Sequence, residues 1–426
     1  MSDTFYSAFD FIAYEEKPDT KHQDSRSAFQ RDRDRVIFSY AFRRLQSKTQ
    51  VFQSGEYDFY RTRLTHSLEV ARIARSIGEE INRRHPTINV DGDLLEAVGL
   101  AHDLGHPPFG HIGERKLNEL MQPWGGFEGN AQTVRILTEI FWQRNDSPQG
   151  MQPSRAFLDG VMKYKALWSE FPERPENHFL YDEQSNIRNF VADDSWPQIK
   201  DPKACNRLKS LECQIMDWAD DTAYSLHDIV DGVKAGFITR KAVEAWITRS
   251  KDSHPELAES PALEALLNLI EKDYLEAIFA KKVGEFIRSV ELEHWDENPL
   301  KDKTPRHGWK LTIPQEIKTE CALYKTIALD LVFRSPRIQQ VEFKSGFLIE
   351  RLFNALIDSH LNHKSDGRIK LQLLPEPALT WLQQTTDEKK RARLICDAIA
   401  QLTDHEAIRL YRRLFDPDYG SISELL

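Results

Sequence analysis

The strongest constraint on the fold is a helical stretch that has to end among side chains able to bind a metal. Residues 93–104 ("DLLEAVGLAHDL") begin with an acidic cap and place apolar residues at helical spacing. Gly105 interrupts this pattern, and Pro107 and Pro108 restrict the backbone that follows. The sequence therefore predicts a helix over 93–104, followed by a stiff loop. The last helical turn and the loop together carry His102, Asp103, His106 and His111.

Helical periodicity dominates the rest of the chain. Residues 64–81 and 210–232 have apolar positions three and four residues apart, with charged residues between them. Segments near 257–292 and 345–362 are also typical of amphipathic helices. Alternating patterns typical of strands are few, so we predict a nearly all-α fold.

Two polar stretches interrupt the helices, over residues 170–203 and 293–316, and both are rich in Pro, Asn and Asp. The second predicts a boundary between a catalytic domain over 1–292 and an additional C-terminal helical lobe over 293–426. A lid or an interface loop would explain the same composition equally well.

Composition excludes several classes of protein. The 426 residues carry a net charge of −10, which argues against a general nucleic-acid-coating protein. No apolar run approaches the roughly 18 residues of a membrane span, and residues 1–24 lack the basic-then-apolar order of a signal peptide. The four cysteines lack CxxC spacing, so we expect reduced thiols in a cytoplasmic protein.

The histidines of the first stretch need partners from elsewhere. Neighbouring residues on a helix point about 100° apart, so His102 and Asp103 reach one ion only if it lies near the helix end. His66, inside the amphipathic stretch 64–81, is a candidate ligand, although a lone histidine on an apolar helix is more often a core residue. A further predicted helix carries Asp220, Tyr224 and Asp228 on one face. Two carboxylates and a phenol aligned in this way are typical of a pocket.

The order H…HD…D resembles the HD phosphohydrolase superfamily, and within it the deoxyguanosine-triphosphate triphosphohydrolase-like (dGTPase-like) branch. The motifs that carry this resemblance lie within about residues 30–232, roughly half the chain. They are "AFRRLQSKTQVF" (41–52), "RTRLTHSLEV" (61–70), "AHDLGHPPFGHIGE" (101–114), "GGFEGNAQ" (125–132) and "ADDTAY" (219–224). A second His-Asp pair, His227–Asp228, lacks the Gly-His-Pro-Pro loop and is interpreted as a decoy.

The resemblance implies an all-α HD core that hydrolyses deoxynucleoside triphosphates (dNTPs), dGTP among them, to deoxynucleoside and inorganic triphosphate. The implied ligands of one divalent metal ion are His66, His102, Asp103 and Asp220. Two imidazoles and two carboxylates suit Mn, Fe, Ni, Co or Zn better than Ca or Mg. The resemblance implies that Mn or Fe is favoured, with Ni, Co, Zn or Mg as alternatives.

The resemblance also assigns the catalytic and substrate-binding residues. His111 is implied as the general acid, oriented by Glu114. The implied phosphate contacts are Arg63, His106, Lys163 and Tyr164, although Lys165 stands where the family usually has proline. The implied sugar contacts are Gln50, Tyr224 and Asp228, with Tyr224 crowding a 2′-hydroxyl.

Simpler interpretations compete with several of these assignments. Asp221 could replace Asp220, His111 could cap a loop, and Arg63 could lie on a solvated basic face. Arg412 and Arg413 are weak candidates for contacting a nucleotide of a neighbouring subunit.

The expected partners are dNTPs, a homo-oligomer, and either an allosteric dNTP or single-stranded DNA. Alternative functions are another HD-type nucleotidase or phosphodiesterase, and a nucleotide-binding or single-stranded-DNA-binding regulator with little turnover.

Overall fold

The protein is almost entirely helical in the computed structural model, as the periodicity predicts. One sheet occurs among the described residues, an antiparallel pair formed by β1 (Glu291–His294) and β2 (Trp309–Thr312) with Glu291 opposite Thr312. Within the same part of the chain, no helix is long and apolar enough to cross a membrane. The structure describes residues 5–15, 24–50, 61–143, 147–193, 199, 201–250, 254–361 and 371–419.

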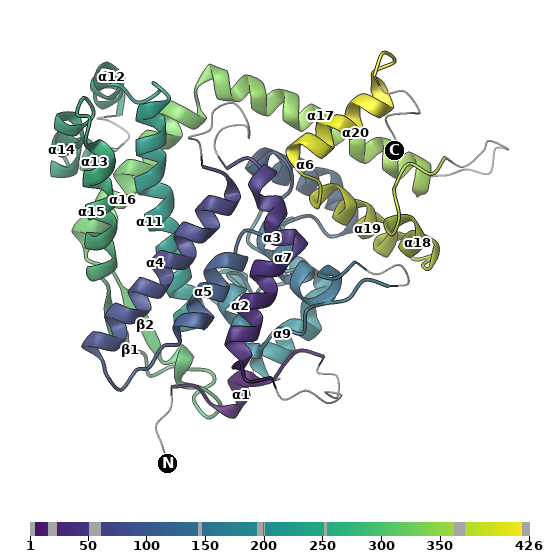
Figure 1. The fold of residues 1–426 in the computed structure, drawn as a ribbon, viewed down its shortest axis with the longest axis horizontal. Coiled ribbons are helices and arrows are strands. Elements are labelled where there is room, and N and C mark those ends of the chain that lie inside the picture. Colours follow the sequence, from purple (N-terminus) through teal and green to yellow (C-terminus); the bar gives the residue numbers. More distant parts are fainter. Residues whose placement is uncertain are drawn as a thin grey trace.

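The first hydrophobic core surrounds three helices that the sequence predicts. The stretches 64–81, 93–104 and 210–232 form α4 (Arg63–Arg84), α5 (Gly92–Ala101) and α11 (Leu211–Lys234). The α4 helix packs on both α5 and α11 in the centre of Figure 1. A Cβ on Gly99 of α5 would lie 2.5 Å from the Cα of Ala71, so glycine permits this close helix crossing.

The second hydrophobic core joins the middle of the chain to its C-terminal part. Here α6 (Gly110–Met121) packs against α17 (Pro336–His360), and α19 (Glu388–Ala400) and α20 (Asp404–Phe415) pack on α17. These C-terminal helices lie together at the upper right of Figure 1. The loop between α5 and α6 joins elements of the two cores.

The stretch near 257–292 forms three helices rather than one, while the stretch 345–362 is the second half of a longer helix, α17. The proposed domain boundary at residue 293 falls inside β1, and α16, which follows it, packs on α11. The remaining α-helices are α1 (Ala8–Phe11), α2 (Ala28–Phe38), α3 (Tyr40–Arg44), α7 (Gly129–Arg135), α8 (Arg155–Val161), α9 (Ser185–Ala192), α10 (Pro202–Asn206), α12 (Arg240–Ser250), α13 (Pro255–Ala258), α14 (Pro261–Leu269), α15 (Leu275–Arg288), α16 (Gln315–Ala328) and α18 (Ala378–Gln383).

Candidate active site

The loop between α5 and α6 is fixed by tight backbone packing. The α5 helix ends at Ala101, earlier than predicted, and His102 is its C-cap residue. A Cβ on Gly105 would lie 2.1 Å from the carbonyl oxygen of Gly129, so only glycine fits this position. The backbone N–H of Gly105 donates to Thr133 Oγ1 at 2.9 Å. These contacts hold the loop against α7.

Three of the predicted metal ligands form one buried cluster. The ligand atoms of His66, His102 and Asp103 all lie within 4.8 Å of one another. Asp220 is adjacent, with its Oδ1 3.1 Å from His66 Nε2 and 3.8 Å from His102 Nε2. Two imidazoles and two carboxylates from three helical segments thus converge on one point.

The chemistry of His102 fits a metal at this point. Its Nδ1 lies 2.7 Å from the carbonyl oxygen of Gly99, an acceptor, so Nδ1 carries the proton. The lone pair of Nε2 therefore faces the cluster, where Nε2 is buried and has no hydrogen-bond partner among the described residues. A buried lone pair without a donor is the electronic state that a divalent ion requires of an imidazole ligand.

Arg63 lies directly behind Asp103. Its Nη1 donates to Asp103 Oδ2 at 2.8 Å, and its Nε donates to the carbonyl oxygen of Thr49 at 2.9 Å. Burial opposes ionisation of Asp103, but His106, His102 and Arg63 outweigh it and hold the pKa of Asp103 well below its ordinary value. The Nη2 of Arg63 is buried and has no hydrogen-bond partner within the described part of the chain, so this atom can still bind a ligand in the cavity.

His111 and Glu114 lie on the first turn of α6, which corrects the prediction that His111 belongs to the loop. Phe109 has φ 64° and Gly110 has φ 58°, and this left-handed turn starts the helix directly after the two prolines. His111 Nδ1 lies 3.6 Å from Glu114 Oε2, and the histidine side chain is 60% exposed while that of Glu114 is 18% exposed. An exposed imidazole is therefore paired with a mostly buried carboxylate.

Glu114 is held ionised by its surroundings. Burial alone would raise its pKa, but the hydrogen bond with His111 and the charges of His106 and His111 lower the pKa to about 2. Its Oε1 also accepts a hydrogen bond from the backbone N–H of Gly129 at 2.6 Å. The neighbouring Glu128 behaves oppositely, because burial and the Glu114 charge raise its pKa to about 8.

Lys163 forms another part of the cavity wall. Lys163 Nζ lies 3.0 Å from Asp217 Oδ1 and 3.4 Å from Asp220 Oδ2. Lys209 forms an ion pair with the same Asp217. The ring of Tyr164 stacks on His178, with ring centroids 4.3 Å apart. Lys163 thus connects the aromatic wall to the predicted metal ligand Asp220.

Two of the three predicted sugar-contacting residues reach the cavity. Gln50 and Tyr224 line it, and Tyr224 stacks on Phe333 with centroids 6.0 Å apart. Asp228 is not among the lining residues. It is buried one helical turn beyond Tyr224 on α11, where burial raises its pKa to about 8 and its Oδ2 has no partner among the described residues.

All the predicted site residues except Asp228 line one cavity of about 460 Å³. Asp221 also lines it, but forms an ion pair with Lys325 instead of joining the His-Asp cluster. Sequence reasoning missed Glu128 and Asp217, although Glu128 lies inside the quoted stretch "GGFEGNAQ" and Asp217 lies one helical turn before Asp220. Other lining residues not predicted are Arg115, Asn130, Glu176, Asn177, His178 and Lys325.

Comparisons with known proteins match both halves of the chain. The model of the HD domain matches residues 63–225, and that of the phosphohydrolase-associated domain matches residues 311–413. The deoxyguanosinetriphosphate triphosphohydrolase-like protein 2 of Deinococcus radiodurans is 34% identical over 437 residues, covering 96% of this chain and 97% of the relative. A deoxyguanosinetriphosphate triphosphohydrolase-like protein of Shewanella loihica is 35% identical over 446 residues, covering 95% of this chain and 96% of the relative.

Proposed function

The chain belongs to the deoxyguanosinetriphosphate triphosphohydrolase-like family of HD-domain phosphohydrolases, and on this premise we propose that it hydrolyses dNTPs to deoxynucleoside and inorganic triphosphate. The coarser activity, metal-dependent nucleotide hydrolysis, follows from the family. The finer proposal is supported by one observation above all. The His-Asp cluster, the His111–Glu114 pair and a cationic wall line a single cavity of about 460 Å³.

In this proposal the ion is held by His66, His102, Asp103 and Asp220. The mixed donor set suits Mn, Fe, Ni, Co or Zn, and the resemblance to the family favours Mn or Fe among them. A divalent ion bound there would polarise a water molecule and a phosphate oxygen. Arg63 orients the carboxylate of Asp103 through its 2.8 Å hydrogen bond, and Gly99 orients the ring of His102.

A water molecule is proposed to attack the α-phosphorus, with one of its protons passing to solvent, while the bond from the α-phosphorus to the 5′ oxygen breaks. His111 is proposed to donate a proton to that 5′ oxygen. Glu114 stays ionised at neutral pH because its pKa is about 2, so it stabilises the imidazolium that donates the proton. The exposure of His111 lets its ring reach a substrate in the cavity. A positioned general acid of this kind contributes a factor of about 10² to 10⁴ in rate.

The phosphate chain would be bound by Arg63 Nη2, His106, Lys163 and Tyr164. Lys163 is bound to Asp217 and Asp220 here, so its binding of phosphate involves exchanging one carboxylate for a phosphate oxygen. Gln50 and Tyr224 are proposed to contact the sugar. Asp228 lies behind these two lining residues, and its effect on sugar binding would be indirect. An oligomer, a dNTP effector and a single-stranded DNA partner stay predictions from the resemblance.

Product analysis tests the reaction. Each of the four dNTPs is incubated with the protein and Mn²⁺, with and without a second dNTP, and the products are separated by mass. Deoxynucleoside with intact triphosphate is the expected result. Release of monophosphate or orthophosphate would contradict the triphosphohydrolase proposal while leaving an HD-type nucleotidase. A His111→Gln protein is the matched control for contaminating phosphatases.

A further inference from the structure

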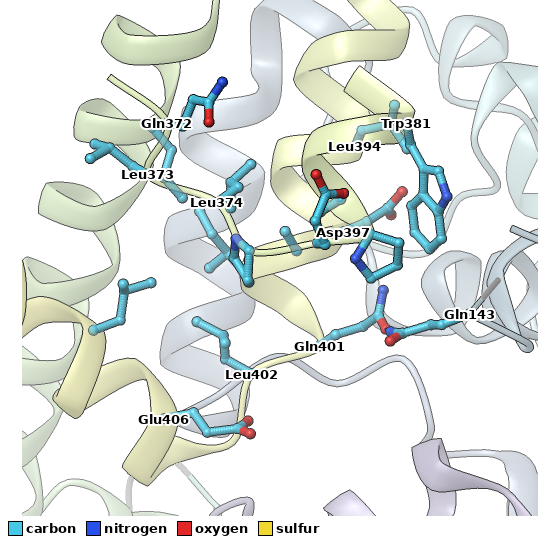
Figure 2. A pocket seen from close by; sticks show the side chains of 18 of the residues that line it. Gln143, Gln372, Leu373, Leu374, Trp381, Leu394, Asp397, Gln401, Leu402 and Glu406 are labelled. Carbon is cyan, nitrogen blue, oxygen red and sulfur yellow. The ribbon is translucent and has the colours of Figure 1, made fainter. Parts of the chain in front are cut away.

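A second cavity lies between α17, α18, α19 and α20. Its volume is about 560 Å³, larger than the 460 Å³ of the candidate active site, and the two cavities share no lining residue. Figure 2 shows its wall, with Leu373 and Leu374 on one side, Trp381 on another, and Gln143 beside Gln401. This volume is within the range of cavities that bind small organic molecules.

Most of the cavity wall is apolar. Leucine side chains from α17, α19, α20 and the segment before α18 form it, together with an indole and two prolines. The apolar lining residues are Leu356, Leu373, Leu374, Pro375, Pro377, Ala378, Trp381, Leu394, Ala398, Ile399, Leu402 and Leu410. Burial of an apolar body against such a wall is favourable, because it removes apolar surface from water.

Three acidic residues line the cavity, and all three are already bound by the protein. Glu406 accepts a hydrogen bond from the backbone N–H of Thr403 at 2.8 Å and forms an ion pair with Arg44 at 3.5 Å. Asp397 accepts hydrogen bonds from Arg135, at 2.8 Å from Nη2, and from Gln132 Nε2 at 2.8 Å. Glu376 accepts from both the backbone N–H and the hydroxyl of Thr380. These carboxylates are therefore not available to a ligand.

Two cations at the rim are available. Arg409 and Arg413 stand one helical turn apart on α20 and both line the cavity. Both are exposed, and the described residues provide neither of them with a hydrogen bond or an ion pair. An apolar wall beside two unpaired guanidinium groups is complementary to a molecule with an apolar body and an anionic head.

The corner between α19 and α20 connects this cavity to the candidate active site. Ile399, Gln401 and Leu402 line the cavity. Between them, the carbonyl oxygen of Ala400 accepts a hydrogen bond from Lys48 Nζ at 2.9 Å. The same Nζ donates to the carbonyl oxygen of His106 at 2.6 Å.

A second connection runs through Asp404, the first residue of α20. Its carboxylate accepts hydrogen bonds from the backbone N–H groups of Thr49 and Phe109, each at 2.9 Å. Thr49 precedes Gln50, and Phe109 precedes α6 with His111. A displacement of the α19–α20 corner therefore reaches residues on both sides of the candidate active site.

We propose that the cavity bounded by α17–α20 binds a small amphipathic organic anion, and that its occupancy alters the candidate active site through Ala400 and Asp404. The head group, a carboxylate, sulfonate or phosphate, binds Arg409 and Arg413. The aliphatic or aromatic body packs on the leucines. The effect on turnover rests on the proposed function, whereas the binding itself does not.

Binding is tested with 1-anilinonaphthalene-8-sulfonate, an aromatic sulfonate whose fluorescence rises on apolar burial. Two variants of the full chain disable the site: Arg409→Gln with Arg413→Gln removes the cations, and Ala398→Trp fills the cavity from its lining. The charge-matched control is Lys390→Gln with Arg412→Gln, on the same two helices but outside the lining.

The expected result is at least tenfold weaker probe binding in both site variants and less than a twofold change in the control. Decanoate and 1-naphthoate should both displace the probe, and the better competitor of the two shows whether the cavity prefers an aliphatic or an aromatic body. Inorganic phosphate should displace the probe far less well. Equal binding in all variants, displacement by inorganic triphosphate, or equal displacement by phosphate alone would each overturn the site.

Coupling is tested by hydrogen exchange at the amides of Thr49 and Phe109, which requires no turnover. A saturating displacing anion should change their exchange rates at least threefold in the wild-type protein and leave them unchanged in Ala398→Trp. Unchanged exchange in the wild type would refute the coupling. Altered exchange in a protein that hydrolyses no dNTP would instead refute the proposed function and support the site.

Discussion

Substituting Lys48 by methionine tests how the loop of the candidate active site is held. The Lys48 side chain is almost completely buried, with 3% of the residue exposed, and its Nζ joins His106 to Ala400 through their carbonyl oxygens. Burial is the main reason that the pKa of Lys48 falls to about 7, and the charge of Arg44 adds to it. Methionine keeps the length and the apolar stem but removes both the charge and the donors.

The sign of the expected effect follows from proton binding. In the unfolded chain the amine has its ordinary pKa of about 10.4, so between pH 7 and 10 the unfolded state binds more protons than the folded state. The free energy of unfolding of the wild-type protein therefore gains a contribution that rises with pH in this window. A folded pKa of about 7 makes that rise about 2 kcal/mol between pH 7 and 9.

At pH 7 the substitution has two opposite effects on stability. It removes two hydrogen bonds, which destabilises the folded state, and it removes the free-energy cost of burying an amine, which stabilises the folded state. Leaving two buried carbonyls unpaired costs about 1–3 kcal/mol each, which is comparable to the cost of burying the lysine. We therefore expect the two proteins to differ little in stability at pH 7. The wild type should become the more stable by about 2 kcal/mol at pH 9.

Urea unfolding of both proteins at pH 7, 8 and 9 measures this difference, with Lys390→Met on the exposed surface of α19 as the control. A stability difference that does not change with pH would refute the depressed pKa and, with it, the buried neutral amine. Because His106 loses a backbone contact, the variant should also show a raised KM for dNTPs with a smaller change in kcat.

Three further substitutions test separate parts of the site and the core. Asp103→Ala should abolish both metal binding, measured by elemental analysis after dialysis, and activity; full metal content would contradict its role as a ligand. His111→Gln should retain metal while kcat falls by about 10² to 10⁴, and unchanged turnover would remove the general-acid assignment. Asp32→Asn concerns stability alone: burial raises the pKa of Asp32 to about 6 although the N–H of Ser154 donates to it. The wild type should therefore lose about 2 kcal/mol relative to the variant as pH rises from 4 to 7, and parallel stability curves would contradict this.

The helices of the first core were predictable because each carries its own pattern. The apolar periodicity of 64–81 and 210–232 appears as α4 and α11, each with a side-chain cap at its N-terminus. The end of α5 was less predictable. The stop was expected at Gly105, but the helix ends at Ala101 because Gly105 has to pack against the backbone of α7, a contact invisible in local sequence.

The site was predictable to the extent that its residues occur in ordered motifs. His66, His102 and Asp103 form one cluster, as the motif order implies. The partners that come from outside the motifs were not predictable. Lys209 reaches the site through its ion pair with Asp217 and lies 5.9 Å from the ring centroid of Tyr164. No spacing rule links a lysine before α11 to a carboxylate two turns into that helix.

The loop of the candidate active site depends on both halves of the chain, and this bears on the proposed division at residue 293. The N–H of Gly105 is bound by Thr133 within the first half. The N–H of Phe109 is bound by Asp404, and the Lys48 amine that holds His106 is also bound to Ala400, both in the second half. A fragment ending at residue 292 would therefore retain all the proposed metal ligands. It would lose two of the contacts that orient His106 and the start of α6, together with the α17 face on which α6 packs. The residues after position 293 are in this sense part of the candidate active site, because the backbone geometry that places His106 and His111 is completed by residues nearly 300 positions farther along the chain.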